Sequence, residues 1–396
     1  MQPWKIVCAA LLTIATLSGC GGKQEISELA IVTAVGIDPG DDGKGVRITA
    51  QIIRAEDARG QTGAPSGGTG EPIYTVTAQG ESIFVAIRNL ARVASRRVYW
   101  AHNFVIAINE EFARVQGIYD LVDFFTRNHE LRMETWVTVT PDRAGELVST
   151  RTGLEIVPGE SIDKLFWYSQ IVGEAPKTSM MRVEEMLYSR TTHPMLARLA
   201  LRKVGISNKA PEQWTKLQQV ELSGAAVFHR DKMKGWLSPN EAKAALYFIQ
   251  GLESSIVALP CPSDERQKAT LELTHQTFKA TPRLKDGEIT LQAELKGEAD
   301  LVESGCRELL VEMESELERR LERHLRESIE GVVGLAQEEY ETDFLKIGDR
   351  VRNEYPVYWN RIERQWDAIF PKVEFDVKTK VDIKGGVLKV RGGDES

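Results

Sequence analysis

Apolar residues recur along the chain with two different periods, which predict strands and helices in alternation. Short runs that are continuously apolar, or apolar at every second residue, are typical of strands. In the first half such runs cover residues 31–37, 46–53, 74–78, 104–108 and 135–140. Between them, apolar residues at steps of three and four predict amphipathic helices over residues 83–93 and 118–125. The first half therefore mixes strands with helices.

The second half repeats this mixture and adds one long helix. Residues 159–199 have a helical pattern interrupted by two prolines. Ser238 and Glu241 form a capping box that predicts the start of another helix. One apolar stripe at helical spacing predicts the long helix: Leu310, Met313, Leu317, Leu321, Leu325, Ile329 and Val332. Further strands are predicted over residues 220–228, 235–237, 270–277, 288–294 and 373–383.

These elements predict an α+β fold. A doubly wound parallel sheet is disfavoured, because the glycine-rich dinucleotide fingerprint of such sheets is absent. We expect three mixed α/β domains built on largely antiparallel or mixed sheets, with the long amphipathic helix in the last domain. Their predicted bounds are 20–200 for an N-terminal α/β domain, 201–262 for a small middle domain, and 263–396 for a C-terminal domain.

Residues 1–19 have the pattern of a signal peptide. One positive charge precedes an apolar run over residues 6–17, which is shorter than the roughly 17 to 25 residues that a membrane-spanning helix needs. The run ends in Leu17-Ser18-Gly19-Cys20, which resembles a bacterial lipoprotein signal. This resemblance implies cleavage before Cys20 and a diacylglyceryl group on its sulfur. The alternative is an ordinary secretory signal with an unmodified Cys20.

The charge of the mature chain narrows the class of partner. Without Lys5, 49 basic residues stand against the 58 acidic residues of the sequence, so the net charge is −9. Such an acidic chain argues against nucleic-acid binding and against electrostatic docking to anionic lipid. We therefore expect the lipid, and not a basic patch, to hold the protein at a membrane.

The two other mature cysteines, Cys261 and Cys306, are candidates for a disulfide. In an extracytoplasmic compartment a bond between them can persist. Closing their 45-residue separation would stabilise the fold by about 4 kcal/mol in the chain-entropy model. Two separately buried thiols are an equal alternative. We expect no metal site, because the sequence has no Cys-x-x-Cys pair and no closely spaced histidines.

Motifs of catalysis are absent from the sequence, which favours a non-enzyme without a cofactor other than the covalent lipid. The six histidines are scattered, and neither a Gly-x-Ser-x-Gly elbow nor a His-Glu-x-x-His motif occurs. The densest charged group of the first domain is His129-Glu130, flanked by Arg127 and Arg132. It could bind an anionic ligand or simply link a helix end by salt bridges.

Taken together, several segments resemble the Ger(x)C spore germination lipoproteins, the C subunits of nutrient germinant receptors. The resemblance is carried, in addition to Cys20, by ELAIVTAVGID (28–38), QII (51–53), AIRNL (86–90), SRRVYWAH (95–102), DFFTRNHELR (123–132), GAAVF (224–228), DK (231–232), GWL (235–237), YPVYW (355–359) and WDAIFP (366–371). Their order and spacing extend over nearly the whole mature chain. The loop over residues 57–72 looks longer than is typical of the family, and we assign it no role.

This resemblance implies a three-domain lipoprotein on the outer face of the spore inner membrane. It also implies integral-membrane A and B subunits as partners and no catalytic residues. Charged and aromatic side chains cluster at element ends, where loops can meet a partner. On that basis we predict the partner interface at Trp100, His102, Arg127, Glu130 and Arg132. The alternative role for these residues is to hold their domain together internally. The alternative for the protein is an extracytoplasmic lipoprotein that binds a small solute.

Overall fold

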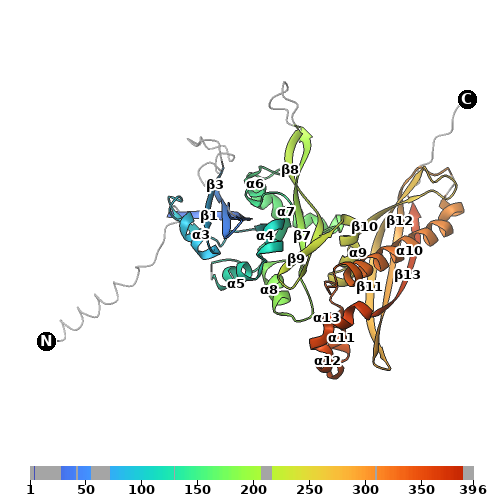
Figure 1. Ribbon diagram of the computed structural model, residues 1–396. Helices are drawn as coiled ribbons and strands as arrows, with labels where there is room; N and C mark the ends of the chain where they lie inside the picture. The colour runs from blue at the N-terminus through green and yellow to red at the C-terminus, as the bar shows by residue number, and fades with distance from the viewer. Residues whose placement is uncertain are drawn as a thin grey trace, which may run out of the picture.

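The computed structural model of the protein describes residues 28–41, 43–54, 72–128, 130–206, 216–307 and 310–386, together with residue 4. Cys20, His129 and nearly all of the 57–72 loop lie outside these ranges, so the predictions for them stay predictions. Two β-sheets with helices packed on them make up the described part of the chain (Figure 1). The predicted α+β class is confirmed.

The first sheet has nine strands within the described ranges. Their order is β3 (Ile73–Gly80), β2 (Val46–Ile53), β1 (Leu29–Pro39), β5 (Val105–Asn109), β6 (Trp136–Thr140), β7 (Met195–Ile206), β8 (Lys216–His229) and β9 (Lys232–Leu237), and β4 (Arg97–Tyr99) pairs with β1. The central strands β1, β5, β6 and β7 run parallel. The flanking strands β2, β3, β8 and β9 are antiparallel to their neighbours, so the sheet is mixed as predicted.

Helices cover both faces of this sheet. They are α3 (Ile83–Leu90), α4 (Glu110–Val115), α5 (Tyr119–Arg127), α6 (Ala144–Ser149), α7 (Pro158–Val172) and α8 (Met180–Tyr188). Val35 and Ile37 of β1 share a core with α3, α4, α5 and α8, whereas Ala34 shares a second core with α6 and α7. Burial on both faces explains why the sequence of β1 is continuously apolar.

A glycine and an aspartate on β1 fix the position of α6. A Cβ at Gly36 would lie 2.6 Å from the backbone of Ala144, so only glycine allows this approach. Asp38 accepts hydrogen bonds from the N–H groups of Ala144 and Gly145, both at 2.8 Å. These bonds satisfy free N–H groups at the start of α6, whose own N-cap residue makes no side-chain cap.

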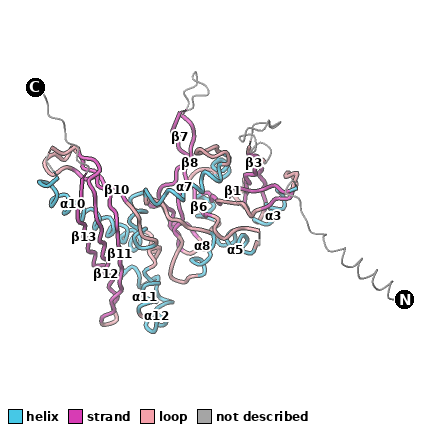
Figure 2. The backbone as a smooth tube through the Cα atoms, turned by 180° about the vertical axis from the view of Figure 1, so that it is seen from behind, coloured by secondary structure: helices cyan, strands magenta, loops and turns pink. Residues whose placement is uncertain are grey.

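The second sheet belongs to the C-terminal part of the chain. Its strand order is β10 (Ser255–Pro260), β11 (Lys268–Lys285), β12 (Glu288–Ser304) and β13 (Glu374–Gly386). Only the last pair, β12 with β13, is parallel. The helix α10 (Leu310–Gly334) lies along this sheet and contacts both β13 and α9 (Pro239–Ile249), as Figures 1 and 2 show. The predicted capping box of Ser238 and Glu241 begins α9.

The stripe that predicted α10 is its buried face. Met313, Leu317, Leu321, Leu325, Ile329 and Val332 are all at most 5% exposed. Two glutamates of the same helix accept hydrogen bonds from the edge strand: Glu322 from Val381 N–H at 3.1 Å and Glu318 from Ile383 N–H at 3.0 Å. These carboxylates cover backbone donors that an open sheet edge would expose.

Three boundaries differ from the predicted ones. The predicted division at residues 200 and 201 falls inside β7, and the sheet continues through β8 and β9 of the predicted middle segment. Residues 195–199, predicted as helical, are the start of β7, because strand pairing with β6 and β8 overrides the local pattern. The hairpin of β11 and β12 is about twice as long as its predicted strands.

A buried aspartate joins the two parts of the molecule, the N-terminal part built on the first sheet and the C-terminal part built on the second. After α10 and η3 (Leu335–Glu339), the chain forms α11 (Ile347–Glu354), α12 (Pro356–Ile362), η4 (Glu363–Gln365), α13 (Trp366–Ile369) and η5 (Phe370–Lys372). The Asp343 carboxylate accepts hydrogen bonds from Ile347 N–H at 2.9 Å, Gly348 N–H at 2.7 Å and Trp366 Nε1–H at 2.9 Å. Its carbonyl accepts from the N–H of His193, just before β7. Asp343 therefore connects the C-terminal helices to the first sheet.

Candidate functional site

Three of the five predicted interface residues line one surface groove. It lies between α3, β4 and α5, has a volume of about 530 Å³, and includes Trp100, Arg127 and Glu130 in its lining. We call it the α3–α5 groove. His102 and Arg132 are exposed nearby but are not part of the lining. The structure thus brings together residues that the sequence places on three separate elements.

Trp100 lies beneath the groove and does not present a surface to a partner. Its side chain is 4% exposed, and its ring packs edge-on against Phe125, with centroids 5.9 Å apart. This burial corrects the prediction that Trp100 contacts a partner. Trp100 instead packs inside its own domain, which was the alternative role given for these residues.

The charged residues of the groove rim form ion pairs within the domain. The Arg127 guanidinium lies 2.9 Å from Asp123 Oδ1, one helical turn earlier, and this hydrogen bond raises the pKa of Arg127. Glu130 pairs with Arg97 of β4. The side chain of Arg127 is still 77% exposed, so its pairing leaves most of it open to a further contact.

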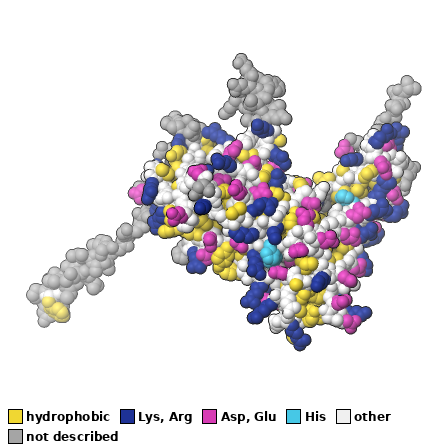
Figure 3. Space-filling view, in the orientation of Figure 1, with side chains coloured by type: hydrophobic (Ala, Val, Ile, Leu, Met, Phe, Trp, Pro, Cys, Tyr) yellow, Lys and Arg dark blue, Asp and Glu magenta, His cyan; other side chains and the backbone are white. Residues whose placement is uncertain are grey.

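Helix α3 exposes an aromatic and an aliphatic side chain that the sequence pattern did not predict as part of the site. Phe84 is 51% exposed and Val85 41%, whereas Ile83, Ala86 and Leu90 form the buried face of the helix. Phe84 contacts the Phe124 ring of α5. The Arg88 guanidinium lies over the Phe84 ring, 4.9 Å from its centroid. The helical spacing of the sequence contained a signal for this exposed surface, because Phe84 and Val85 fall outside the buried stripe of α3. Hydrophobic side chains are visible on this side of the molecule in Figure 3.

The groove is close to the point where the described chain begins. β4 pairs with the start of β1, and Leu29 is opposite Arg97 in the register. Figure 1 shows α3 and β1, the first described strand, at the same end of the molecule. The segment from Ser82 to Asn109 contains four arginines and no acidic residue, so this segment is basic although the whole chain is acidic.

Elsewhere, the structure pairs two histidines that are distant in sequence. The rings of His193 and His229 are 4.6 Å apart. His229 Nδ1 lies 3.2 Å from Thr342 Oγ1, and His193 Nε2 lies 3.7 Å from Asp367 Oδ1. Spacing along the sequence contained no signal for this pair, because strand pairing and C-terminal packing create it.

This histidine cluster lacks an accessible nucleophile. Thr342 is 1% exposed, and its hydroxyl donates a hydrogen bond to Tyr340 O at 2.9 Å. Burial, and then the charge of His193, lower the pKa of His229. The described residues also contain no group of three His, Cys, Asp or Glu side chains placed to hold a metal ion. The cluster connects the two parts of the molecule.

Comparison with known proteins decides the family. The family model described as "Spore germination protein N-terminal domain" matches residues 22–201, and that described as "Spore germination B3/ GerAC like, C-terminal" matches residues 223–386. The chain belongs to the Ger(x)C family of spore germination proteins. Both models together cover most of the sequence, so membership in this family assigns the protein a role in spore germination.

Individual relatives agree with this assignment. This Ger(x)C protein is 25% identical to spore germination protein KC of Bacillus subtilis (strain 168), over 94% of this chain and 93% of the relative. Identity to spore germination protein B3 of the same organism is 22%, over 95% and 96% of the two chains. The crystal structure of the GerBC protein has the same fold, with a TM-score of 0.54 and 20% identity over 88% of this chain and 96% of that one.

Within the described ranges, this Ger(x)C protein has no helix that is both long and apolar enough to span a membrane.

Proposed function

We propose that the protein is the lipid-anchored subunit of a nutrient germinant receptor and acts there without catalysis. The observation that carries this proposal is the match of both family models, in order, over residues 22–201 and 223–386. The Leu-Ser-Gly-Cys junction ending at Cys20 supports attachment to the outer face of the spore inner membrane. Its integral-membrane partners would be the A and B subunits of the receptor.

The short tether supports the α3–α5 groove as the surface that meets these partners. Glu28 lies eight residue steps after Cys20, and a fully extended chain of that length spans at most about 29 Å. Leu29 is paired with Arg97 on the groove wall. A lipid on Cys20 would thus keep this end of the protein next to the bilayer, where an integral subunit is within reach.

Tethering would make a modest interface sufficient. Confinement at the membrane raises the effective concentration of the partners, so assembly does not require high intrinsic affinity. In this mechanism the protein is a scaffold that keeps the receptor assembled, and the exposed aromatic residue Phe84 contributes apolar contact area at the groove.

Replacement of the lipidated cysteine tests the anchoring. With Cys20→Ala, we expect a folded protein with an unchanged melting temperature, a lower receptor level in the inner membrane and slower germination, because the tether is lost. Intact-mass measurement of the mature wild-type protein checks that the diacylglyceryl group is present. Full receptor abundance and unchanged germination with the unlipidated variant would contradict the proposal.

A charge placed in the groove tests the interface. Phe84→Glu should leave the melting temperature within about 1 °C, because Phe84 is half exposed, yet weaken partner association on the order of tenfold. The measurement is recovery of the A and B subunits with tagged protein from detergent-solubilised spore membranes. Val357→Glu on α12 is the matched control, since Val357 is 71% exposed and α12 lies far from α3 in Figure 1. Equal recovery with both variants would exclude the groove as the interface.

A further inference from the structure

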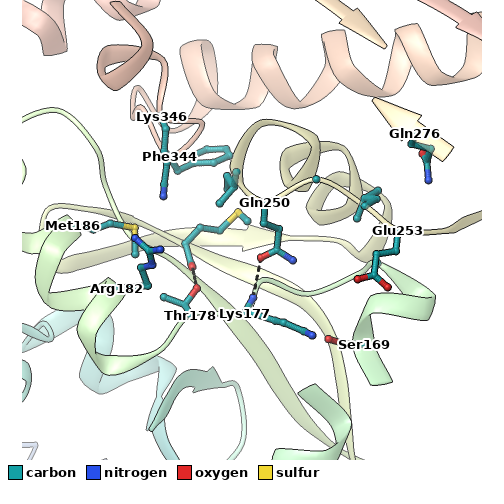
Figure 4. Close-up of a pocket in the computed structure, with 15 residues that line it drawn as sticks. Ser169, Lys177, Thr178, Arg182, Met186, Gln250, Glu253, Gln276, Phe344 and Lys346 are labelled. Carbon is teal, nitrogen blue, oxygen red and sulfur yellow. Dashed lines mark hydrogen bonds between the residues drawn. The ribbon is translucent and has the colours of Figure 1, made fainter. Parts of the chain in front are cut away.

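A second cavity lies where the two parts of the molecule meet. It has a volume of about 500 Å³ and is walled by α7, α8 and the segment between them, by the α9–β10 loop, and by the segment that precedes α11. Figure 4 shows Arg182, Lys177 and Thr178 on one side, Gln250 and Glu253 on the loop, and Phe344 with Lys346 on the opposite side. We call it the junction cavity.

Positive charge dominates this cavity. Lys177, Arg182 and Lys346 line it, and Glu253 is the one acidic residue among the described residues of the lining. Arg182 pairs with Glu185 at 2.8 Å. Within the described ranges, however, no carboxylate lies within 4 Å of the amino groups of Lys177 and Lys346, which are both partly buried. Burial lowers the pKa of Lys177, and the charge of Glu253 opposes this only in part. A bound anion would relieve this unbalanced charge.

The neutral groups of the cavity also favour an anion that has an apolar part. Gln250 Oε1 accepts a hydrogen bond from Lys177 N–H at 3.2 Å, which leaves the Gln250 amide N–H groups to donate. Ile249 and Leu252 supply apolar surface in the same lining, because both side chains are only partly buried. Hydrogen-bond donors together with apolar side chains are the ordinary composition of a small-molecule site.

We propose that the junction cavity binds a small organic anion, whose negative charge is balanced by Lys177 and Lys346 and whose apolar part packs against Leu252. Bound there, the anion bridges the N-terminal and C-terminal parts of the molecule, because the two lysines come from opposite walls. The site is separate from the α3–α5 groove and does not depend on the receptor role of the protein.

Melting temperature measured by intrinsic tryptophan fluorescence tests this site in the purified mature protein, residues 20–396. The probes are benzoate, succinate, inorganic phosphate and the uncharged analogue benzamide, each up to 20 mM. We expect benzoate or succinate to raise the melting temperature in a saturable way and benzamide to leave it unchanged. Lys177→Gln and Lys346→Gln should each raise the dissociation constant at least about tenfold, because each removes one charge-assisted contact.

The matched control is Lys285→Gln, which removes the same charge at the exposed tip of the β11–β12 hairpin. It should retain the full shift. No saturable shift with any of the three anions, or equal affinity in the Lys177→Gln, Lys346→Gln and Lys285→Gln variants, would overturn the proposal. A shift with phosphate alone would overturn the apolar half of the site. Since no lipidation or receptor partner enters this experiment, its failure leaves the proposed function untouched.

Discussion

Replacing Asp343 with alanine is expected to lower the free energy of unfolding by about 3 to 5 kcal/mol. The carboxylate is 2% exposed and accepts three hydrogen bonds, from Ile347, Gly348 and Trp366. Alanine would leave all three donors buried without a partner, and each such donor costs about 1 to 3 kcal/mol. Part of this cost is offset, because the variant no longer buries a carboxylate. Urea denaturation followed by tryptophan fluorescence measures the loss. A change below 1 kcal/mol would contradict this role of Asp343.

The same residue predicts a specific pH dependence. Burial raises the pKa of Asp343 from 3.8 to about 6, against the opposing effect of its hydrogen bonds to Gly348 and Ile347. The folded state therefore binds the proton more tightly than the unfolded chain between about pH 4 and pH 6. Stability from this group is largest below pH 4 and falls as the pH rises through 6, by up to about 3 kcal/mol.

An Asp343→Asn variant isolates this effect, because it keeps the shape of the side chain and all other titrating groups, including His193. The stability of the wild type minus that of the variant should decrease from pH 4 to pH 7. A difference that is constant with pH would show that the carboxyl group has an ordinary pKa.

Loss of the disulfide should have an effect of similar size. In the structure Cys261, after β10, is bonded to Cys306, after β12, at an Sγ–Sγ distance of 2.08 Å. Breaking this link frees a 45-residue loop in the unfolded chain, so Cys261→Ala with Cys306→Ala should cost about 4 kcal/mol. The measurement is denaturant unfolding of both proteins without reductant.

Reductant provides the control for this experiment. Dithiothreitol should destabilise the wild type toward the value of the double variant and leave the variant itself unchanged. Equal stability of the oxidised wild type and the double variant would exclude a stabilising disulfide. Mass mapping of unreduced peptides checks that the bond is present in the protein purified from spores.

The candidate site could be predicted from the sequence only in part. The cluster of charged residues around Arg127 and Glu130 pointed to α5, and these residues do line a groove. Trp100 was assigned to the same surface because of its residue type, yet it packs inward on Phe125. Phe84 was overlooked because its neighbours already formed a complete helical stripe. Residue type alone does not reveal which side of an element another segment covers.

What the sequence by itself determined is local. The capping box at Ser238, the continuous stripe of α10 and the buried run of β1 follow from residues within a few positions of each other, since periodicity and capping are short-range effects. Family membership was also readable from the sequence, because it depends on the order of many weak local matches.

The tertiary structure alone decided which distant segments meet. Strand β7 joins β6 and β8 across the predicted domain boundary, Asp343 gathers donors from three segments, and Lys177 and Lys346 face one cavity. Most of these contacts join residues that are not neighbours in the sequence, and their formation depends on the total free energy of packing and of buried hydrogen bonds. The hydrophobic periodicity of short segments does not determine this total free energy. The sheet order, the histidine pair and the junction cavity are therefore seen only in the folded chain.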